Sequence, residues 1–113
     1  MSELFNLHDR KFRALRNVDN GDVSKETLFH YRQKDKIIWA TYEGGSVLFG
    51  TLSGKIEGNR LTFNYQHQNT SGELMTGFCT SEIKIEKGII RLHETWQWTC
   101  GDRSKGTSVL EEI

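Results

Sequence analysis

Residues 61–80 read LTFNYQHQNTSGELMTGFCT. Over residues 61–67, large apolar and aromatic side chains alternate with hydroxyl and amide side chains, which is the period of a β-strand with two unlike faces. The turn signal NTSG follows, and a second run of strand type comes after it. Because a short hairpin sets which residues oppose each other, the stretch predicts that Tyr65 lies opposite Gly77 and Phe63 opposite Cys79.

The same unit recurs along the whole chain. Turn signals of Gly, Asn, Asp and Ser come at short intervals and separate about eight runs of strand length. They are DNGD at 19–22, QKDK at 33–36, EGGS at 43–46, EGN at 57–59, NTSG at 69–72, EKG at 86–88 and GDRSKG at 101–106. An open sheet of this size would leave two edges unpaired, so the pattern favours closure. The sequence therefore predicts an all-β protein, a single eight-stranded antiparallel up-and-down β-barrel.

The barrel domain is expected to span residues 11–113, preceded by an N-terminal segment over residues 1–10. Within that segment, residues 2–8 could form one short helical turn that packs against the sheet through Leu4, Phe5 and Leu7. The segment has no long apolar run, so it reads as neither a secretory signal nor a membrane span. A cytoplasmic location is the expectation.

Composition narrows the classes of partner. The 113-residue chain carries 15 basic and 15 acidic residues, and this balance predicts no binding to nucleic acid or to an anionic membrane. Its two cysteines, Cys79 and Cys100, are too few for a disulfide framework. Neither a Cys-x-x-Cys nor a His-x-x-x-His spacing occurs, so no metal site and no cofactor are predicted.

Hairpin registers taken from all the turns predict one inward face that contains the three tryptophans and Glu94. The set is Phe12, Ala14, Arg16, Thr27, Phe29, Tyr31, Ile37, Trp39, Leu48, Gly50, Leu52, Leu61, Phe63, Tyr65, His67, Met75, Gly77, Ile83, Leu92, Glu94, Trp96 and Trp98, with Val109 and Glu111. Inward glycines lie beside large aromatic residues in this register. They either make room for the rings or leave part of the interior open.

Glu94 is the most unusual member of this face. It lies in RLHETWQWTCGDRSKG, residues 91–106, on the same side of the strand as Trp96 and Trp98. A carboxylate inside a barrel costs several kcal/mol unless it is paired, hydrogen-bonded or protonated. Two explanations remain open at this point: a structural link to another inward group, or a role in orienting a ligand. The candidate partners are Arg16, Tyr65, His67 and Ser81.

Function is predicted from this interior. The preferred hypothesis is a binding module whose aromatic, partly charged cavity holds a small amphiphilic molecule. Its mouth is expected at the end where DNGD, EGGS, NTSG and GDRSKG meet, and its floor is expected to be closed by Ile37, Ile56, Ile83, Ile85 and Ile90, with Phe5 and Leu7 beneath. The predicted ligand-binding residues are Trp39, Phe63, Tyr65, His67, Glu94, Trp96, Trp98 and Arg16.

Two other hypotheses stay open. An enzyme could use Glu94 as an acid or base with help from Tyr65 or His67, which requires burial to move the pKa of Glu94 toward neutrality. Alternatively, a filled barrel could act as an interaction protein. Leu28, Ala40 and Phe49 are predicted to form an outer apolar patch, which would suit a homodimer.

Three segments, WATYEGG at 39–45, YQHQNTSGELMTG at 65–77 and RLHETWQWTCGDRSKG at 91–106, together with the closing LEEI, resemble a family of small bacterial proteins often labelled "N-acetylglutamate synthase". That label implies acetyl transfer to glutamate. The usual acetyl-CoA site needs a Gln/Arg-x-x-Gly-x-Gly/Ala loop at the start of a helix, and this sequence has neither, so no catalytic residues are assigned. In architecture the chain resembles the calycins, which include lipocalins, fatty-acid-binding proteins and avidins, and that resemblance implies ligand binding inside the barrel.

Overall fold

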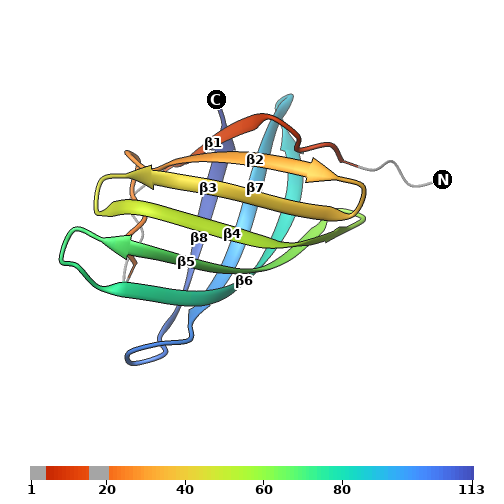
Figure 1. The fold of residues 1–113 in the computed structure, drawn as a ribbon. Coiled ribbons are helices and arrows are strands. Elements are labelled where there is room, and N and C mark those ends of the chain that lie inside the picture. The colour runs from red at the N-terminus through yellow and green to blue at the C-terminus, as the bar shows by residue number, and fades with distance from the viewer. Residues whose placement is uncertain (1–4, 16–20) are drawn as a thin grey trace.

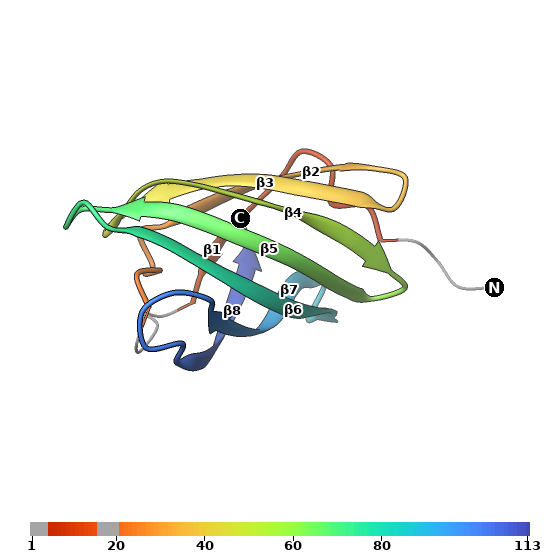
Figure 2. The ribbon, with the colours of Figure 1, turned by 60° about the horizontal axis from the view of Figure 1, so that its bottom comes forward.

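The computed structural model describes residues 5–15 and 21–113. Eight antiparallel strands form one closed barrel, in which each strand pairs with the next and the last pairs with the first. Figures 1 and 2 show the sheet curling until its two ends meet. The predicted fold class is confirmed. The strands are β1 (Arg10–Ala14), β2 (Leu28–Lys34), β3 (Ile37–Gly44), β4 (Val47–Glu57), β5 (Arg60–Asn69), β6 (Leu74–Glu86), β7 (Ile89–Trp98) and β8 (Lys105–Glu112).

The hairpins β5–β6 and β6–β7 have the register that the sequence predicts. Tyr65 pairs with Gly77, and Phe63 pairs with Cys79. Cys79 pairs in turn with Trp96 on β7. These strands alternate strictly and their turns are short, so the inward face of this half of the barrel follows directly from the sequence.

The β3–β4 hairpin differs from the prediction. Gly44 pairs with Val47 across the turn, but a β-bulge follows, after which Tyr42 pairs with Gly50. One extra residue on a strand reverses which face every later side chain occupies. Trp39 therefore lies on the outer face, where its side chain is 37% exposed. The prediction that Trp39 points into the barrel is wrong.

The same bulge corrects the neighbouring positions. Ile38, Ala40 and Tyr42 of β3 are buried, whereas Ile37 is exposed, and on β4 Val47 is buried in place of Leu48. The outer patch predicted from Leu28, Ala40 and Phe49 loses its middle member, because Ala40 belongs to the core. On β8, Ser108 and Leu110 face inward in place of Val109 and Glu111.

The end of the barrel opposite the β1–β2, β3–β4 and β5–β6 turns is closed by the N-terminal segment. Leu7 is fully buried, and Phe5 packs against the core. The Leu7 N–H donates a hydrogen bond to Gln33 Oε1 (3.0 Å), and the Gln33 N–H donates to His8 Nδ1 (3.1 Å), which fixes this segment to β2. No helix occurs among the described residues, and residues 2–4 of the helical turn predicted over residues 2–8 lie outside them.

Isoleucines form the floor, but not all of those predicted. Ile38, Ile56 and Ile83 are buried. Ile37 and Ile85 are each 60% exposed, because Ile37 is on the outer face of β3 and Ile85 lies near the end of β6. The bottom of the barrel is therefore packed by the inward residues of β3, β4 and β6 together with Leu7.

Aromatic rings fill the space beside the inward glycines Gly50 and Gly77. A Cβ placed on Gly77 would overlap the ring of Tyr65, and one on Gly50 would overlap the ring of Tyr42. The glycines therefore make room for aromatic side chains, which is one of the two explanations that the sequence left open.

Candidate functional site

A narrow cavity of about 40 Å³ remains between the rings in the interior of the barrel. One water molecule needs roughly 10–15 Å³ of such space, so the cavity has room for a few waters or for a slender chemical group. It extends from the loop before β2 to Glu94 on β7. Its lining residues are Gly21, Asp22, Val23, Phe29, Tyr42, Leu52, Phe63, Tyr65, His67, Cys79, Glu94, Trp96, Trp98 and Ser108.

Trp98 is the centre of the aromatic wall. Its ring centroid lies 5.5 Å from that of Trp96, 5.8 Å from that of Tyr65 and 5.8 Å from that of His67. All of these pairs are tilted or edge-on, which is the favoured geometry for aromatic side chains. Trp96 and Trp98 alternate with outward residues along β7, so their position follows from the period of the strand.

Glu94 lies deeper in the same cavity and is 8% exposed. The Ser108 hydroxyl donates a hydrogen bond of 2.9 Å to Glu94 Oε1, because the two residues face each other across β7 and β8. Burial raises the pKa of Glu94 to about 7, and the hydrogen bond from Ser108 opposes this shift. Near neutral pH the carboxyl group therefore exists in both forms, one of which can donate as well as accept a hydrogen bond.

Among the described residues, the hydrogen-bond partner of Glu94 is not one of those predicted. Arg16 lies outside the described residues. His67 is occupied by other groups. Ser81 lies opposite Glu94 in the register, but its hydroxyl is buried without a hydrogen-bond partner among the described residues. The partner found, Ser108, was missed because the residues before β8 contain no short turn that would set the strand's face.

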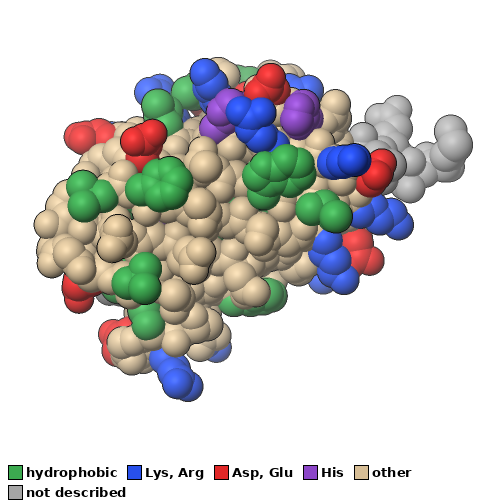
Figure 3. All heavy atoms as spheres, viewed as in Figure 1, with side chains coloured by type: hydrophobic (Ala, Val, Ile, Leu, Met, Phe, Trp, Pro, Cys, Tyr) green, Lys and Arg blue, Asp and Glu red, His purple; other side chains and the backbone are tan. Residues whose placement is uncertain are grey.

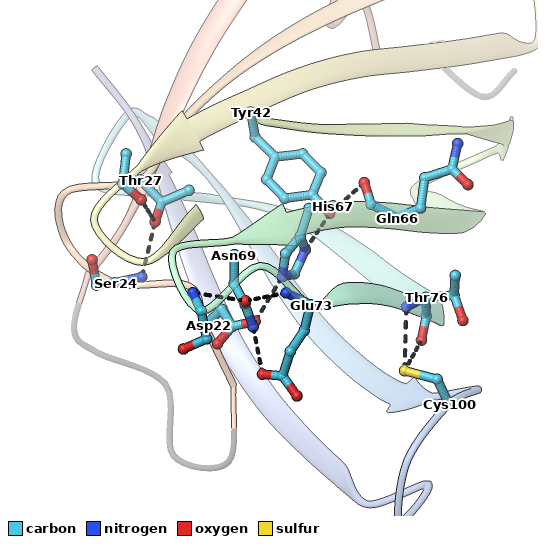
Figure 4. Close-up of polar contacts among 12 residues, drawn as sticks. Asp22, Ser24, Thr27, Tyr42, Gln66, His67, Asn69, Glu73, Thr76 and Cys100 are labelled. Atoms are coloured by element: carbon cyan, nitrogen blue, oxygen red, sulfur yellow. Dashed lines mark hydrogen bonds and ion pairs between the residues drawn. The ribbon is translucent and has the colours of Figure 1, made fainter. Parts of the chain in front are cut away.

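A second polar network joins the cavity to the loop before β2 (Figure 4). His67 Nε2 lies 2.8 Å from Asp22 Oδ2, and His67 Nδ1 lies 2.9 Å from the Tyr42 hydroxyl. Asn69 Nδ2 donates to Asp22 Oδ2 (3.2 Å) and to Glu73 Oε1 (3.0 Å). If Nε2 carries the proton of a neutral imidazole, it donates to Asp22 while Nδ1 accepts from the Tyr42 hydroxyl, so both ring nitrogens of His67 are satisfied.

This network fastens the loop before β2 over the cavity, so its loss is expected to be measurable. Asp22→Ala should lower the free energy of unfolding by about 2 kcal/mol, since it leaves His67 Nε2 without its charged partner and takes from Asn69 one of its two carboxylate acceptors. Urea denaturation checks this value. Glu26→Ala, a change at an exposed position in the same loop, is the control and should cost less than about 0.5 kcal/mol. Equal losses for both variants would contradict a fastening role for Asp22.

Six predicted site residues meet in the cavity. They are Phe63, Tyr65, His67, Glu94, Trp96 and Trp98. Trp39 is excluded, because the bulge on β4 leaves it on the outer face. Tyr42 and Asp22, which the sequence did not single out, line the cavity instead. The bulge that leaves Trp39 on the outer face also places Tyr42 on the inner face, and the alternation of residues does not predict it.

Cys79 also lines the cavity. Burial raises the pKa of the Cys79 thiol, so it is held in its neutral, unreactive form. No group of three or more His, Cys, Asp or Glu side chains gathers around a common point in the described part of the chain. The described residues also contain no helix long and apolar enough to span a membrane.

Comparison with known proteins agrees with the fold. The chain matches the family of avidin-like proteins over residues 5–113. Its structure is similar to that of apo shwanavidin, with a TM-score of 0.69 at 11% sequence identity, over 94% of this chain and 98% of the other. No curated protein matches the sequence significantly. Because the family match spans nearly the whole chain, this barrel belongs to the avidin-like protein family.

Proposed function

We propose that the protein binds one small amphiphilic molecule inside the barrel, with the molecule's polar end at Glu94 and Ser108 and its apolar part along Trp96 and Trp98. The observation that carries the proposal is the buried carboxyl group of Glu94 in an aromatic cavity, with Ser108 as its hydrogen-bond donor. A filled core would be more stable with an apolar residue at this position. A ligand group would compensate for the burial.

The chemistry of the polar end follows from the groups that it meets. An ionised carboxylate accepts hydrogen bonds only, so it favours a group with N–H donors, such as an amide, a urea or an amine. The tryptophan rings favour a flat or slender apolar part beside them. Avidin-like proteins are a family that binds small ligands such as biotin, which makes biotin the first compound to test here.

The narrowness of the cavity adds a condition. A molecule larger than a few waters needs space that Tyr65 and the loop at residues 21–23 occupy in this structure. Tyr65 is only half buried, at the cavity wall. Binding is therefore expected to displace the Tyr65 ring or the loop, and to be slower than diffusion-limited association.

The test is a thermal-shift screen of biotin and other small amides, ureas and amines, followed by calorimetric titration of the compounds that stabilise the protein. Binding of such a compound should weaken at least about tenfold in Glu94→Gln, because a hydrogen bond to a charged group is worth about 1.5–3 kcal/mol. Trp98→Phe should also weaken it. Glu82→Gln, a matched change on the outer face of β6, should leave affinity unchanged.

Two results would count against the proposal. One is a screen in which no compound stabilises the protein. The other is a compound that binds with equal affinity to the wild type, Glu94→Gln and Trp98→Phe, since such a compound would occupy a different place.

A further inference from the structure

A second hollow lies on the outside of the barrel, over β3 to β6. This outer groove has a volume of about 470 Å³, and it shares only Leu52 and Tyr65 with the lining of the interior cavity. Among the described residues, none of those that line it is charged. They are Trp39, Ala40, Thr41, Thr51, Leu52, Ser53, Asn64, Tyr65, Gln66, Thr76, Gly77 and Thr99.

The side chains of the outer groove form ordered rows across the strands. In one row Trp39 pairs with Ser53, Ser53 with Asn64, and Asn64 with Phe78. Trp39 is 37% exposed and Phe78 is 45% exposed. Three interstrand spacings separate these two rings, a distance of about 14 Å. Trp39 lines the groove and Phe78 lies just outside its lining, so two aromatic rings flank a hydroxyl and an amide.

The next row is made of hydroxyl and amide groups, which hydrogen bonds hold in place. Thr41 pairs with Thr51, and Thr51 with Gln66. Gln66 Nε2 donates a hydrogen bond to Thr51 Oγ1 (3.3 Å), and the hydroxyls of Thr76 and Thr99 lie 2.8 Å apart. Groups held in this way lose little conformational freedom when a ligand binds them.

The absence of charge in this region is unusual for the chain. Charged residues make up 27% of the sequence, and a soluble surface normally mixes both signs. Here Arg32 and Lys105 lie at the two ends of the row that contains Trp39. Lys55 lies outside both rows, where it pairs with Ile37 and Thr62. In Figure 3, which views this side of the molecule, uncharged side chains cover the middle of the face and charged ones lie around its edge.

We propose that the outer groove binds a neutral oligosaccharide. Sugar rings present a face of C–H groups that packs on aromatic rings such as Trp39 and Phe78. They also present hydroxyl groups that both donate and accept hydrogen bonds, as the Thr, Asn and Gln side chains of the groove do. An uncharged ligand needs no counter-charge, and the groove offers none. The spacing of the two rings favours a chain of several sugars over a single one.

A second copy of the protein fits this face less well. The cores of homodimer interfaces are rich in apolar surface and contain few exposed hydroxyl groups. In the outer groove, hydroxyl and amide side chains outnumber the exposed aromatic ones. The groove is also concave, which suits a ligand that lies in it.

The test titrates the whole protein with cellohexaose, maltohexaose, laminarihexaose and chitohexaose by calorimetry, with size-exclusion light scattering on the same samples. At least one of these sugars is expected to bind, with an affinity that does not change between low and high salt. Trp39→Ala and Asn64→Ala, both changes at exposed positions, should each weaken binding about tenfold. Lys84→Ala, on the outer face of β6 beyond the groove, should not.

Three outcomes would overturn the proposal. These are the absence of binding by all four sugars, binding that Trp39→Ala leaves unchanged, and a dimer that Ser53→Lys dissociates. Trp39, Ser53 and Asn64 do not line the interior cavity, so these measurements can fail while the proposed function stands, and the reverse also holds.

Discussion

Gly54→Ala is expected to prevent folding or to lower the free energy of unfolding by more than about 4 kcal/mol. A Cβ at this position would collide with the carbonyl oxygen of Thr62 and lie 2.6 Å from the Cα of Phe63. Both are backbone atoms of the neighbouring strand β5, which rotation of a side chain does not move. The barrel would have to separate β4 from β5 where Gly54 pairs with Phe63, inside the ladder that joins the two strands. Urea denaturation followed by circular dichroism measures the loss.

The neighbouring residue supplies the control. Lys55→Ala lies one position along β4, on the exposed outer face, and should change the free energy of unfolding by less than about 0.5 kcal/mol. Gly77→Ala should lie between the two, because the overlapping group there is the ring of Tyr65, which can rotate. A Gly54→Ala protein that unfolds cooperatively with a loss below about 1 kcal/mol would show that β4 and β5 are not packed in this way.

Glu94 is expected to make the folded protein less stable as the pH rises from about 4.5 to about 7. Burial raises the pKa of Glu94 from 4.5 to about 7. Between these values the folded chain holds a proton that the unfolded chain has released, so the free energy of unfolding falls with rising pH. At 1.36 kcal/mol for each pKa unit, the full loss amounts to roughly 3 kcal/mol, and it is complete once the pH exceeds the folded pKa.

Glu94→Gln removes this titration and keeps the size of the side chain. The variant should therefore gain stability over the wild type as the pH rises, by roughly 3 kcal/mol between pH values of about 4.5 and about 8. Urea denaturation of both proteins across this range measures the difference. Other titrating groups affect both proteins equally and cancel in it. Stability curves that run parallel would mean that Glu94 titrates as an exposed carboxyl does.

The sequence predicts the half of the barrel formed by β5 to β7 residue by residue. Their turns are short, and the pairing of β5 with β6 and of β6 with β7 has no bulge, so the period alone assigns each side chain to a face. Glu94, Trp96 and Trp98 were placed correctly for this reason. Fold class followed from the same regularity.

The half formed by β3, β4 and β8 was harder to predict. EGGS predicts a turn at residues 43–46, but this sequence does not predict the bulge after which Tyr42 pairs with Gly50. Because of this one extra residue on β4, Trp39 lies on the outer face and Tyr42 on the inner face, the reverse of the prediction. The sequence of the loop before β8 does not fix the register of that strand either. The position of Ser108, the hydrogen-bond donor to Glu94, was therefore not predicted.

Long-range polar contacts were also beyond the sequence. His67 was expected to face inward, and it does, but its partner Asp22 is 45 residues away in the chain. Hairpin pairing relates only neighbouring strands, so it carries no information on a loop that folds over the barrel's end. Acetyl transfer to glutamate, which the bacterial family label implies, stays a prediction, as do the cytoplasmic location and the homodimer.

The most direct test of the central claim uses Trp39→Phe, whose two remaining tryptophans, Trp96 and Trp98, both line the interior cavity. A compound that raises the melting temperature of this variant is titrated while tryptophan emission is recorded. If the barrel binds its ligand inside, the emission changes saturably, with the same dissociation constant that calorimetry gives. A stabilising compound that leaves the emission of Trp96 and Trp98 unchanged would contradict the account.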